Sequence, residues 1–311
     1  MSRPTGSPVE HEALPPLAPV PVRPRRLVYL GTPAMAVPPL RALVAAGFDV
    51  AGVVTRIDKR RSRGGALVPS PVKVAADELG IAVLHRVDDA LGLEADLGVV
   101  VAFGQIIRPH ALALLPMVNL HFSLLPRWRG AAPVERALLA GDTETGVCVM
   151  QVEHGLDTGG VYARAEVPIG ERMTAPQLRA ELVEVGTELL VRTLRDGLER
   201  AEPQVGEPVY AAKIDPTELK IDWTQPAEQL DRLVRLGGAW TTFRGKRLRI
   251  VAAEPTDAAA DSVPGELRGA TVTCGEGGLL LMDVQPEGRQ SMPAGAWANG
   301  ARPAAGERLG S

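Results

Sequence analysis

The stretch RRLVYLGTPAMAVPPLRALVAAGFDVAGVVT (residues 25–55) decides the fold. It begins with an apolar run that is typical of a buried strand and continues with a helical pattern from Pro38 to Ala46. It ends in a second apolar strand, DVAGVVT. A strand, a helix and a second strand within about 30 residues form a βαβ unit. Because such a unit joins parallel strands, the stretch predicts an α/β domain.

The same rhythm continues downstream. Further elements are expected as a helix at 72–80, a strand at 97–104, a helical turn at 109–115 and a short strand at 118–122. TGVCVMQVE (145–153) predicts another strand, GVYARAEVPI (160–169) its antiparallel partner, and the Leu-rich segment after it a long helix. Continuous Val-rich strands that alternate with helices are typical of a parallel sheet with both faces covered. We therefore expect a Rossmann-like, mostly parallel sheet.

The last hundred residues lack this rhythm. Short β-like runs, RLRIVAAE, GATVTC and GLLLMDVQ, are separated by Gly and Pro, which predicts a small all-β domain resembling an OB barrel. At the other end, a run of prolines with two acidic residues has neither the positive start nor the apolar core of a secretory signal. We expect a disordered Pro-rich tail at 1–25, an α/β domain at 26–206 and the β domain at 207–311.

Composition narrows the class of protein. The chain has 311 residues, of which 45% are hydrophobic and 23% charged, as in soluble globular proteins. The formal charge is −3, so an anionic partner must be held by a local basic patch. Two cysteines, Cys148 and Cys274, are too few for a disulfide framework or a thiolate zinc site. We expect a cytoplasmic monomer without a metal ion, and no apolar run is long enough to span a membrane.

Three polar side chains are candidates for chemistry. In NLHFSLLPRWRGAAP (119–133), Asn119 and His121 are two residues apart on a strand, so they point to the same side. Asp157 lies downstream in the glycine-rich segment HGLDTGG (154–160). An Asn and a His at a strand end often only satisfy the backbone, and an Asp beside glycines is often a turn residue. Together, however, an amide, an imidazole and a carboxylate suit acyl transfer without a covalent nucleophile.

The region 119–160 resembles the signature region of the folate-dependent formyltransferases. Segments that agree include LGTPAMAVPPLRAL, VPSPVKVAADELGIAV, VVAFGQIIRP, AAKIDPTELKIDW and VQPEGRQSMPAGAWANG, so the resemblance covers nearly all of 27–310. PRWRGAAP, SPVK and the second domain resemble the branch that acts on charged tRNA. The resemblance implies transfer of formyl from 10-formyltetrahydrofolate to the α-amino group of methionine on initiator methionyl-tRNA, with Asn119, His121 and Asp157 as catalytic residues.

The resemblance also implies where both substrates bind. It places the folate among the residues of two loops: Ser123, Leu124, Leu125 and Pro126, and Phe103, Gln105, Ile106 and Ile107. It places tRNA on the basic loop that contains Arg61 and Arg63, with Arg63 at the position of the family's key arginine. The charge pattern adds four further candidates for tRNA binding: Arg127, Arg129, Arg247 and Arg249. Arg61 and Arg63 belong to the basic segment TRIDKRRSRGG (55–65), and Arg247 and Arg249 share one face of the strand in KRLRI. Clustered arginines suit the phosphate backbone of a nucleic acid.

Other functions remain open at this point. A folate formyltransferase or hydrolase that acts on a small amine or on water would share the catalytic residues but would not need the basic segments. An inactive RNA-binding relative would not need Asn119, His121 and Asp157. A dinucleotide-dependent oxidoreductase is disfavoured, because the segment after the first strand lacks the three spaced glycines that admit a pyrophosphate.

Overall fold

The computed structural model describes residues 14–60, 65–257 and 262–310. The chain divides into two compact units. Unit 1 comprises Met1–His121, Val149–Ala163 and Thr187–Pro203, and unit 2 comprises Phe122–Cys148, Arg164–Gly186 and Gln204–Ser311. Among the described residues, no helix combines the length and the apolar composition that a membrane span requires.

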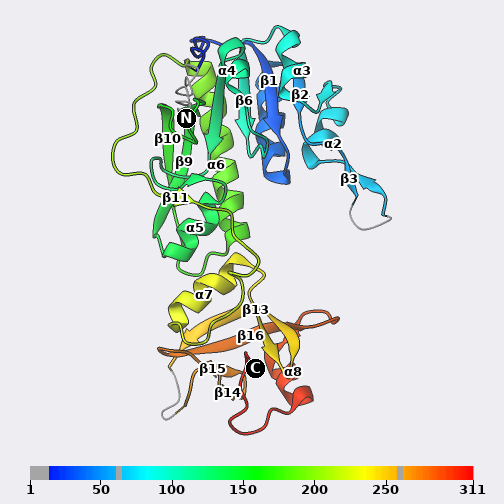
Figure 1. Ribbon diagram of the computed structural model, residues 1–311, viewed down its shortest axis with the longest axis vertical. Coiled ribbons are helices and arrows are strands. Elements are labelled where there is room, and N and C mark those ends of the chain that lie inside the picture. Colours follow the sequence, from blue (N-terminus) through cyan, green and yellow to red (C-terminus); the bar gives the residue numbers. More distant parts are fainter. Residues whose placement is uncertain (1–13, 61–64, 258–261, 311) are drawn as a thin grey trace, which may run out of the picture. The chain divides into compact units, whose positions relative to one another are not determined.

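The main sheet has the strand order β10-β9-β7-β6-β1-β2-β5 (Figure 1). Its strands are β1 (Arg26–Gly31), β2 (Asp49–Val54), β5 (Val83–Leu84), β6 (Leu97–Val101), β7 (Met117–His121), β9 (Glu144–Gln151) and β10 (Val161–Pro168). Strands β5, β2, β1, β6 and β7 are parallel, which confirms the predicted sheet. Strands β9 and β10 are antiparallel, since Gln151 pairs with Gly160 while Gly146 lies against the carbonyl of Ala165.

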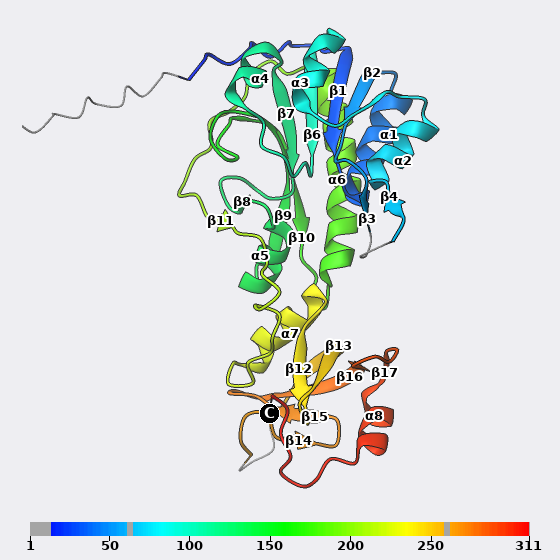
Figure 2. The same ribbon diagram turned by 45° about the vertical axis from the view of Figure 1, so that its right-hand side comes forward.

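Helices connect these strands. They are α1 (Val37–Ala45), α2 (Pro71–Glu78), α3 (Val87–Ala90), α4 (Pro109–Leu114), α5 (Pro133–Ala140) and α6 (Ala175–Asp196), with 3-10 turns η1 (Ala34–Ala36) and η2 (Leu91–Leu93). On one face of the sheet, α3 and α4 pack against β1, β6 and β7 in a cluster that includes Val28, Val100, Leu112 and Met117. Helices α1 and α2 contact β2 (Figure 2). Two short pairs, β3 (Lys59–Arg60) with β4 (Leu67–Val68) and β8 (Arg129–Gly130) with β11 (Tyr210–Ala211), lie outside this sheet.

The C-terminal part of unit 2 contains an antiparallel sheet in the order β12-β13-β16-β15-β14, with β17 beside β16. Its strands are β12 (Trp240–Phe243), β13 (Lys246–Thr256), β14 (Leu267–Arg268), β15 (Thr271–Thr273), β16 (Gly278–Pro286) and β17 (Met292–Pro293). The predicted C-terminal β domain is confirmed as an antiparallel sheet, to which two helices are added. Helices α7 (Ala227–Leu236) and α8 (Ala294–Ala301) pack against this sheet through Leu230, Val234 and Trp297.

The expected disorder of the N-terminal tail does not hold for residues 14–25. Ala18 N donates to Leu112 O at 2.9 Å, and Leu198 N donates to Val22 O at 2.7 Å. Leu17 packs against the apolar cluster under α4. The prolines explain why this segment is ordered without a helix or strand of its own. They lack N–H groups that need partners, and they fix φ, which lowers the entropy lost on docking.

Candidate active site

Two of the candidate polar residues lie near the carboxyl end of β7. The strand pairs in parallel with β6, with Asn119 opposite Val100 and Leu120 opposite Val101. Asn119 and His121 therefore share one face of the strand, while Leu120 points to the other and is buried. The His121 side chain is 6% exposed and Asn119 is half-buried. An imidazole this deeply buried needs polar partners, because unpaired buried polar groups are costly.

Asp157 provides such a partner. Its Oδ2 lies 3.7 Å from Nδ1 of His121, and its side chain is 14% exposed. The residue has a φ of +50°, which is a left-handed conformation. In a non-glycine residue this conformation costs about 1–3 kcal/mol, and it persists only where the surrounding structure enforces it. Such strained residues cluster at functional sites. The structure thus brings together an imidazole and a carboxylate that are separated by 36 positions in the chain.

The loop that carries Asp157 is fixed at its base. Gln151 N donates to Gly160 O at 2.8 Å, which closes the loop between β9 and β10. A Cβ atom on Gly159 would lie 2.0 Å from the Gln151 carbonyl oxygen, so only glycine fits there. The glycines of HGLDTGG therefore have a steric role: they let the chain double back closely enough for Asp157 to face His121.

The expected folate residues after β7 are mostly enclosed. Ser123 is fully buried, and its hydroxyl donates to the Arg127 carbonyl at 2.6 Å. Leu125 is 2% exposed, while Leu124 and Pro126 are half-buried. The Ser123 hydroxyl thus holds the shape of its own loop. If this loop contacts a ligand, backbone groups are better placed to do so than the Ser123 and Leu125 side chains.

The expected folate residues after β6 have the opposite character. Ile106 is 91% exposed and Gln105 is exposed as well, with its side-chain amide donating to His85 O at 3.4 Å. Phe103 and Ile107 are partly buried and pack against the cluster beneath α4. The segment thus has two anchored apolar residues and, between them, an apolar side chain left in solvent.

Asp142 organises the segment PRWRG, and sequence reasoning missed it. Its carboxylate accepts hydrogen bonds from Arg127 Nε at 2.9 Å, Arg127 Nη2 at 2.6 Å and Trp128 Nε1 at 2.7 Å. The hydrogen bonds from Arg127 to Asp142 raise the pKa of the guanidinium further. The guanidinium also lies 4.5 Å from the centre of the Trp128 ring. Nothing in the sequence around Asp142 marks it, because its role depends on packing across 14 residues.

The expected tRNA-binding arginines differ in their surroundings. Arg61 and Arg63 lie outside the described residues. Arg129 donates through Nε and Nη2 to the neutral Gln204 side chain at 3.1 and 2.7 Å, contacts that leave its charge uncompensated. Arg249 likewise donates to the neutral Gln285 at 3.0 Å. Arg247 stacks over Trp240, with its Cζ 4.3 Å from the ring centre.

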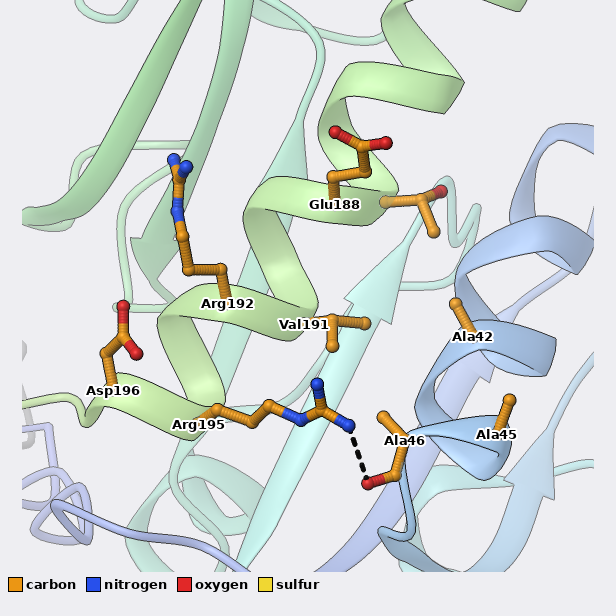
Figure 3. Close-up of a pocket in the computed structure, with 9 residues that line it drawn as sticks. Ala42, Ala45, Ala46, Glu188, Val191, Arg192, Arg195 and Asp196 are labelled. Carbon is orange, nitrogen blue, oxygen red and sulfur yellow. Dashed lines mark hydrogen bonds between the residues drawn. The ribbon is translucent and has the colours of Figure 1, made fainter.

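Two surface hollows lie away from Asn119, His121 and Asp157. In unit 2, Arg247 and Arg249 help line a hollow of about 470 Å³. In unit 1, a hollow of about 600 Å³ lies between α1 and the end of α6 (Figure 3). There Arg195 donates to Ala46 O at 3.1 Å, and two arginines are balanced by Glu188 and Asp196. None of the candidate catalytic residues lines the second hollow, so its size alone does not make it the active site.

Neither cysteine has the surroundings of a nucleophile. Cys148 is fully buried in β9, and burial raises the pKa of its thiol. Burial raises the pKa of Cys274 to about 11. Because the thiolate is the reactive form, both groups stay protonated and inert near neutral pH. The structure brings His121 and Asp157 together, and neither thiol belongs to that pair.

Comparisons with known proteins show the family of the chain. The formyl transferase family model matches residues 25–194, and the formyl transferase C-terminal domain model matches residues 213–302. A methionyl-tRNA formyltransferase from Thermobifida fusca is 46% identical over 308 residues, covering 92% of this chain and 99% of the relative. One from Roseobacter denitrificans is 45% identical over 295 residues, covering 88% and 95%.

Solved structures share the fold at low sequence identity. An N-formyltransferase from Helicobacter canadensis, in complex with folinic acid and dTDP-3-aminofucose, has a TM-score of 0.63 at 17% identity over 86% of this chain and 99% of that chain. HypX from Aquifex aeolicus with tetrahydrofolic acid has a TM-score of 0.60 at 17% identity over 92% and 48%. The match of both domain models and the near full-length relatives show that the chain belongs to the formyl transferase family, among the methionyl-tRNA formyltransferases.

Proposed function

We propose that the chain transfers the formyl group of 10-formyltetrahydrofolate to the α-amino group of methionine on initiator methionyl-tRNA, in the cytoplasm. The relatives named methionyl-tRNA formyltransferase, matched over nearly their full length, support this substrate pair. The observation that carries the proposal is the approach of His121 to Asp157, 3.7 Å apart on a strand end and a constrained loop. A binding module without activity has no need for that pair.

In the proposed step, the neutral α-amino nitrogen attacks the formyl carbon. A new carbon–nitrogen bond forms, and the bond from this carbon to N10 of the folate breaks. Negative charge develops on the formyl oxygen, where Asn119 and His121 donate hydrogen bonds; each donor of this kind lowers a barrier by about 2.7–4 kcal/mol. Asp157 orients His121, accepts the amine proton directly or through water, and returns that proton to N10 as the bond from the formyl carbon to N10 breaks.

The acceptor amine needs little activation. An α-amino group has a pKa of about 7.7–8.0, so a useful fraction is neutral at pH 7. The enzyme therefore needs no nucleophile of its own, which fits the two inert thiols. The main demands on the protein are to position two substrates and to stabilise developing charge.

We assign the folate to the two loops that follow β6 and β7. The exposed Ile106, flanked by the anchored Phe103 and Ile107, supports an apolar cover for a planar ring. Gln105 and the backbone of 123–126 would supply polar contacts to the ring edge. Ser123 and Leu125 would act by shaping their loop, because their side chains are buried.

We assign tRNA to the basic residues. The guanidinium groups of Arg129 and Arg249 hydrogen-bond to neutral glutamines and that of Arg247 stacks on Trp240, which supports a role in binding phosphates. The Glu287 carboxylate, which accepts from the Arg247 backbone amide, offsets part of this positive charge. Arg127 is already paired with Asp142, so its contribution would be to hold the loop as much as to contact the tRNA. Arg61 and Arg63 remain assigned from the sequence. In this proposal 26–206 performs the transfer and also contacts the tRNA, and 207–311 adds the tRNA contacts of Arg247 and Arg249.

One assay tests the proposed function. The protein is incubated with 10-formyltetrahydrofolate and charged initiator methionyl-tRNA, and the ester is hydrolysed to look for N-formylmethionine. Parallel reactions contain free methionine, an amino sugar nucleotide or buffer alone. We expect formyl transfer only to the tRNA-bound amine. Transfer to a small amine, or release of formate at an equal rate without an acceptor, would contradict the proposal.

A further inference from the structure

The segment before β1 is anchored to unit 1 along its length. From 14 to 24, which we call the N-terminal strap, it passes α4 before the first strand begins (Figure 2). Ala18 donates to Leu112 at the end of α4, and Val22 accepts from Leu198 just beyond α6. A Cβ atom on Gly197 would lie 3.3 Å from Val22, so the strap approaches the end of α6 closely. The strap precedes the residues that the family model matches, which begin at 25.

The first anchor of the strap lies on the loop that carries Asp157. His154 Nε2 is 3.0 Å from the Pro15 carbonyl oxygen. A carbonyl oxygen only accepts hydrogen bonds, so Nε2 must carry the proton and donate. His154 is three residues before Asp157 in the same loop. The contact therefore ties the strap to the middle of this loop, whereas the β9–β10 pairing ties its base.

A second contact supports the first. Leu17 packs against the apolar cluster that contains Leu112 and Met117, and Val152, at the start of the loop, packs against the same cluster. Val152 N also donates to Met117 O at 2.8 Å. The strap and the loop thus pack against the same apolar cluster. A displacement of the strap would therefore affect the loop through the packing of Leu17 and through the hydrogen bond of His154.

The position of the loop matters because a small shift of Asp157 changes whether its carboxylate can hydrogen-bond with His121. At 3.7 Å, Oδ2 and Nδ1 are farther apart than a hydrogen bond, for which 2.7–3.2 Å is typical. A shift of about 0.5–1 Å in the loop therefore decides whether the carboxylate can hydrogen-bond with Nδ1, and misplacements of this size can cost up to about 10²-fold in rate.

We propose that the N-terminal strap is a positioning element of the active site, which holds the Asp157 loop in place through the hydrogen bond from His154 to the Pro15 carbonyl. His154 acts through Asp157 and does not itself touch the reacting atoms. The kinetic part of this inference rests on the proposed function. The structural part, control of the loop by the strap, does not.

The kinetic test uses two substitutions at His154 in the full-length chain. His154→Ala removes the donor, whereas His154→Gln places an amide N–H near the position of Nε2. Because one hydrogen bond contributes about 0.5–1.5 kcal/mol, we expect His154→Ala to lower kcat about 2- to 12-fold at saturating tRNA. We expect His154→Gln to recover most of that loss and to keep the pH profile of kcat. Two variants that are equally impaired, or both equal to wild type, would overturn the proposal.

The structural test measures hydrogen exchange of the amides in 153–159. Leu17→Ala and His154→Ala should each speed exchange in this loop, while exchange in β1 and β6 stays as in wild type. Because either substitution releases the same strap, the double variant should exchange little faster than either single variant. Unchanged exchange in the loop overturns the proposal whatever the kinetics. If the wild-type protein formylates no tRNA, the exchange result still decides the role of the strap.

Discussion

Nδ1 of His121, at the end of β7, lies 3.7 Å from Oδ2 of Asp157, which sits in a left-handed conformation in the β9–β10 loop. Both side chains are largely removed from water, so the interaction between them is stronger than it would be at the surface. The strand determines where the imidazole points and the glycine-rich loop determines where the carboxylate lies. The proposed chemistry depends on these two positions more than on any unusual residue.

Substitution of Asn119 tests the proposed hydrogen bond to the formyl oxygen. Replacement by Ala should lower kcat by about 10²–10³ and leave KM for both substrates nearly unchanged, because the lost hydrogen bond forms only as charge develops. Steady-state kinetics with each substrate varied in turn measure this effect, and thermal melting checks that β7 is intact. A rise in KM with an unchanged kcat would mean that Asn119 binds substrate instead.

Asp142 tests the organisation of the PRWRG segment. Asp142→Ala removes the acceptor of three hydrogen bonds from Arg127 and Trp128, two of them from a half-exposed guanidinium. We expect a fall of about 2 kcal/mol in the free energy of unfolding, measured by urea denaturation. Arg127→Ala should add little in the Asp142→Ala background. Additive losses would show that Arg127 stabilises the fold independently of Asp142, for example through its contact with the Trp128 ring.

Arg247 and Arg249 test the tRNA surface of the antiparallel sheet. Each change to Ala should raise KM for tRNA, leave KM for the folate unchanged and reduce the slope of log K against log salt by about 1. Arg268→Ala is the matched control, because that arginine is in the same sheet but its guanidinium pairs with Glu266. Equal effects of all three substitutions would point to net charge and not to a defined surface.

Replacement of Glu307 tests how the stability of the C-terminal segment depends on pH. The hydrogen bonds from Arg244 and from the Ala304 amide lower the pKa of this carboxyl from 4.5 to about 2. A pKa lowered by folding stabilises the native state above the unfolded value, and this contribution is lost as the pH falls through the folded value. The difference in Tm between wild type and Glu307→Gln should thus be full above pH 4.5 and shrink towards pH 2. A difference that is independent of pH would exclude this linkage.

The parallel part of the fold was predictable from the sequence. Buried parallel strands such as β1 and β6 are apolar on both faces, so they appear as unbroken Val and Leu runs. Helix α7 was not predicted although Leu230, Leu233 and Val234 have helical spacing, because the buried Asp231 interrupts the apolar face that the spacing would otherwise indicate. Helix α8, rich in Ala and Gly, offers no such pattern. Its helical state depends on the packing of Trp297 against the sheet.

The approach of His121 to Asp157 was predictable from the sequence, but the contacts that support their positions were not. The i, i+2 spacing on a strand predicted that Asn119 and His121 share a face, and the glycine-rich loop predicted a tight turn around Asp157. Asp142 and the contact of Pro15 with His154 could not be predicted, since each depends on residues brought together by the fold. Proline-rich composition, which usually indicates disorder, gave the wrong expectation for the strap.

The central claim is that Asp157 accepts the amine proton and orients His121. Single-turnover transfer of formyl to methionyl-tRNA by Asp157→Asn tests it most directly, because this substitution keeps the shape of the side chain and removes its basicity. We expect the rate of transfer to fall at least about 100-fold, within the range that a positioned base contributes, while the melting temperature stays near that of wild type. A near-wild-type rate in the folded variant would contradict the account.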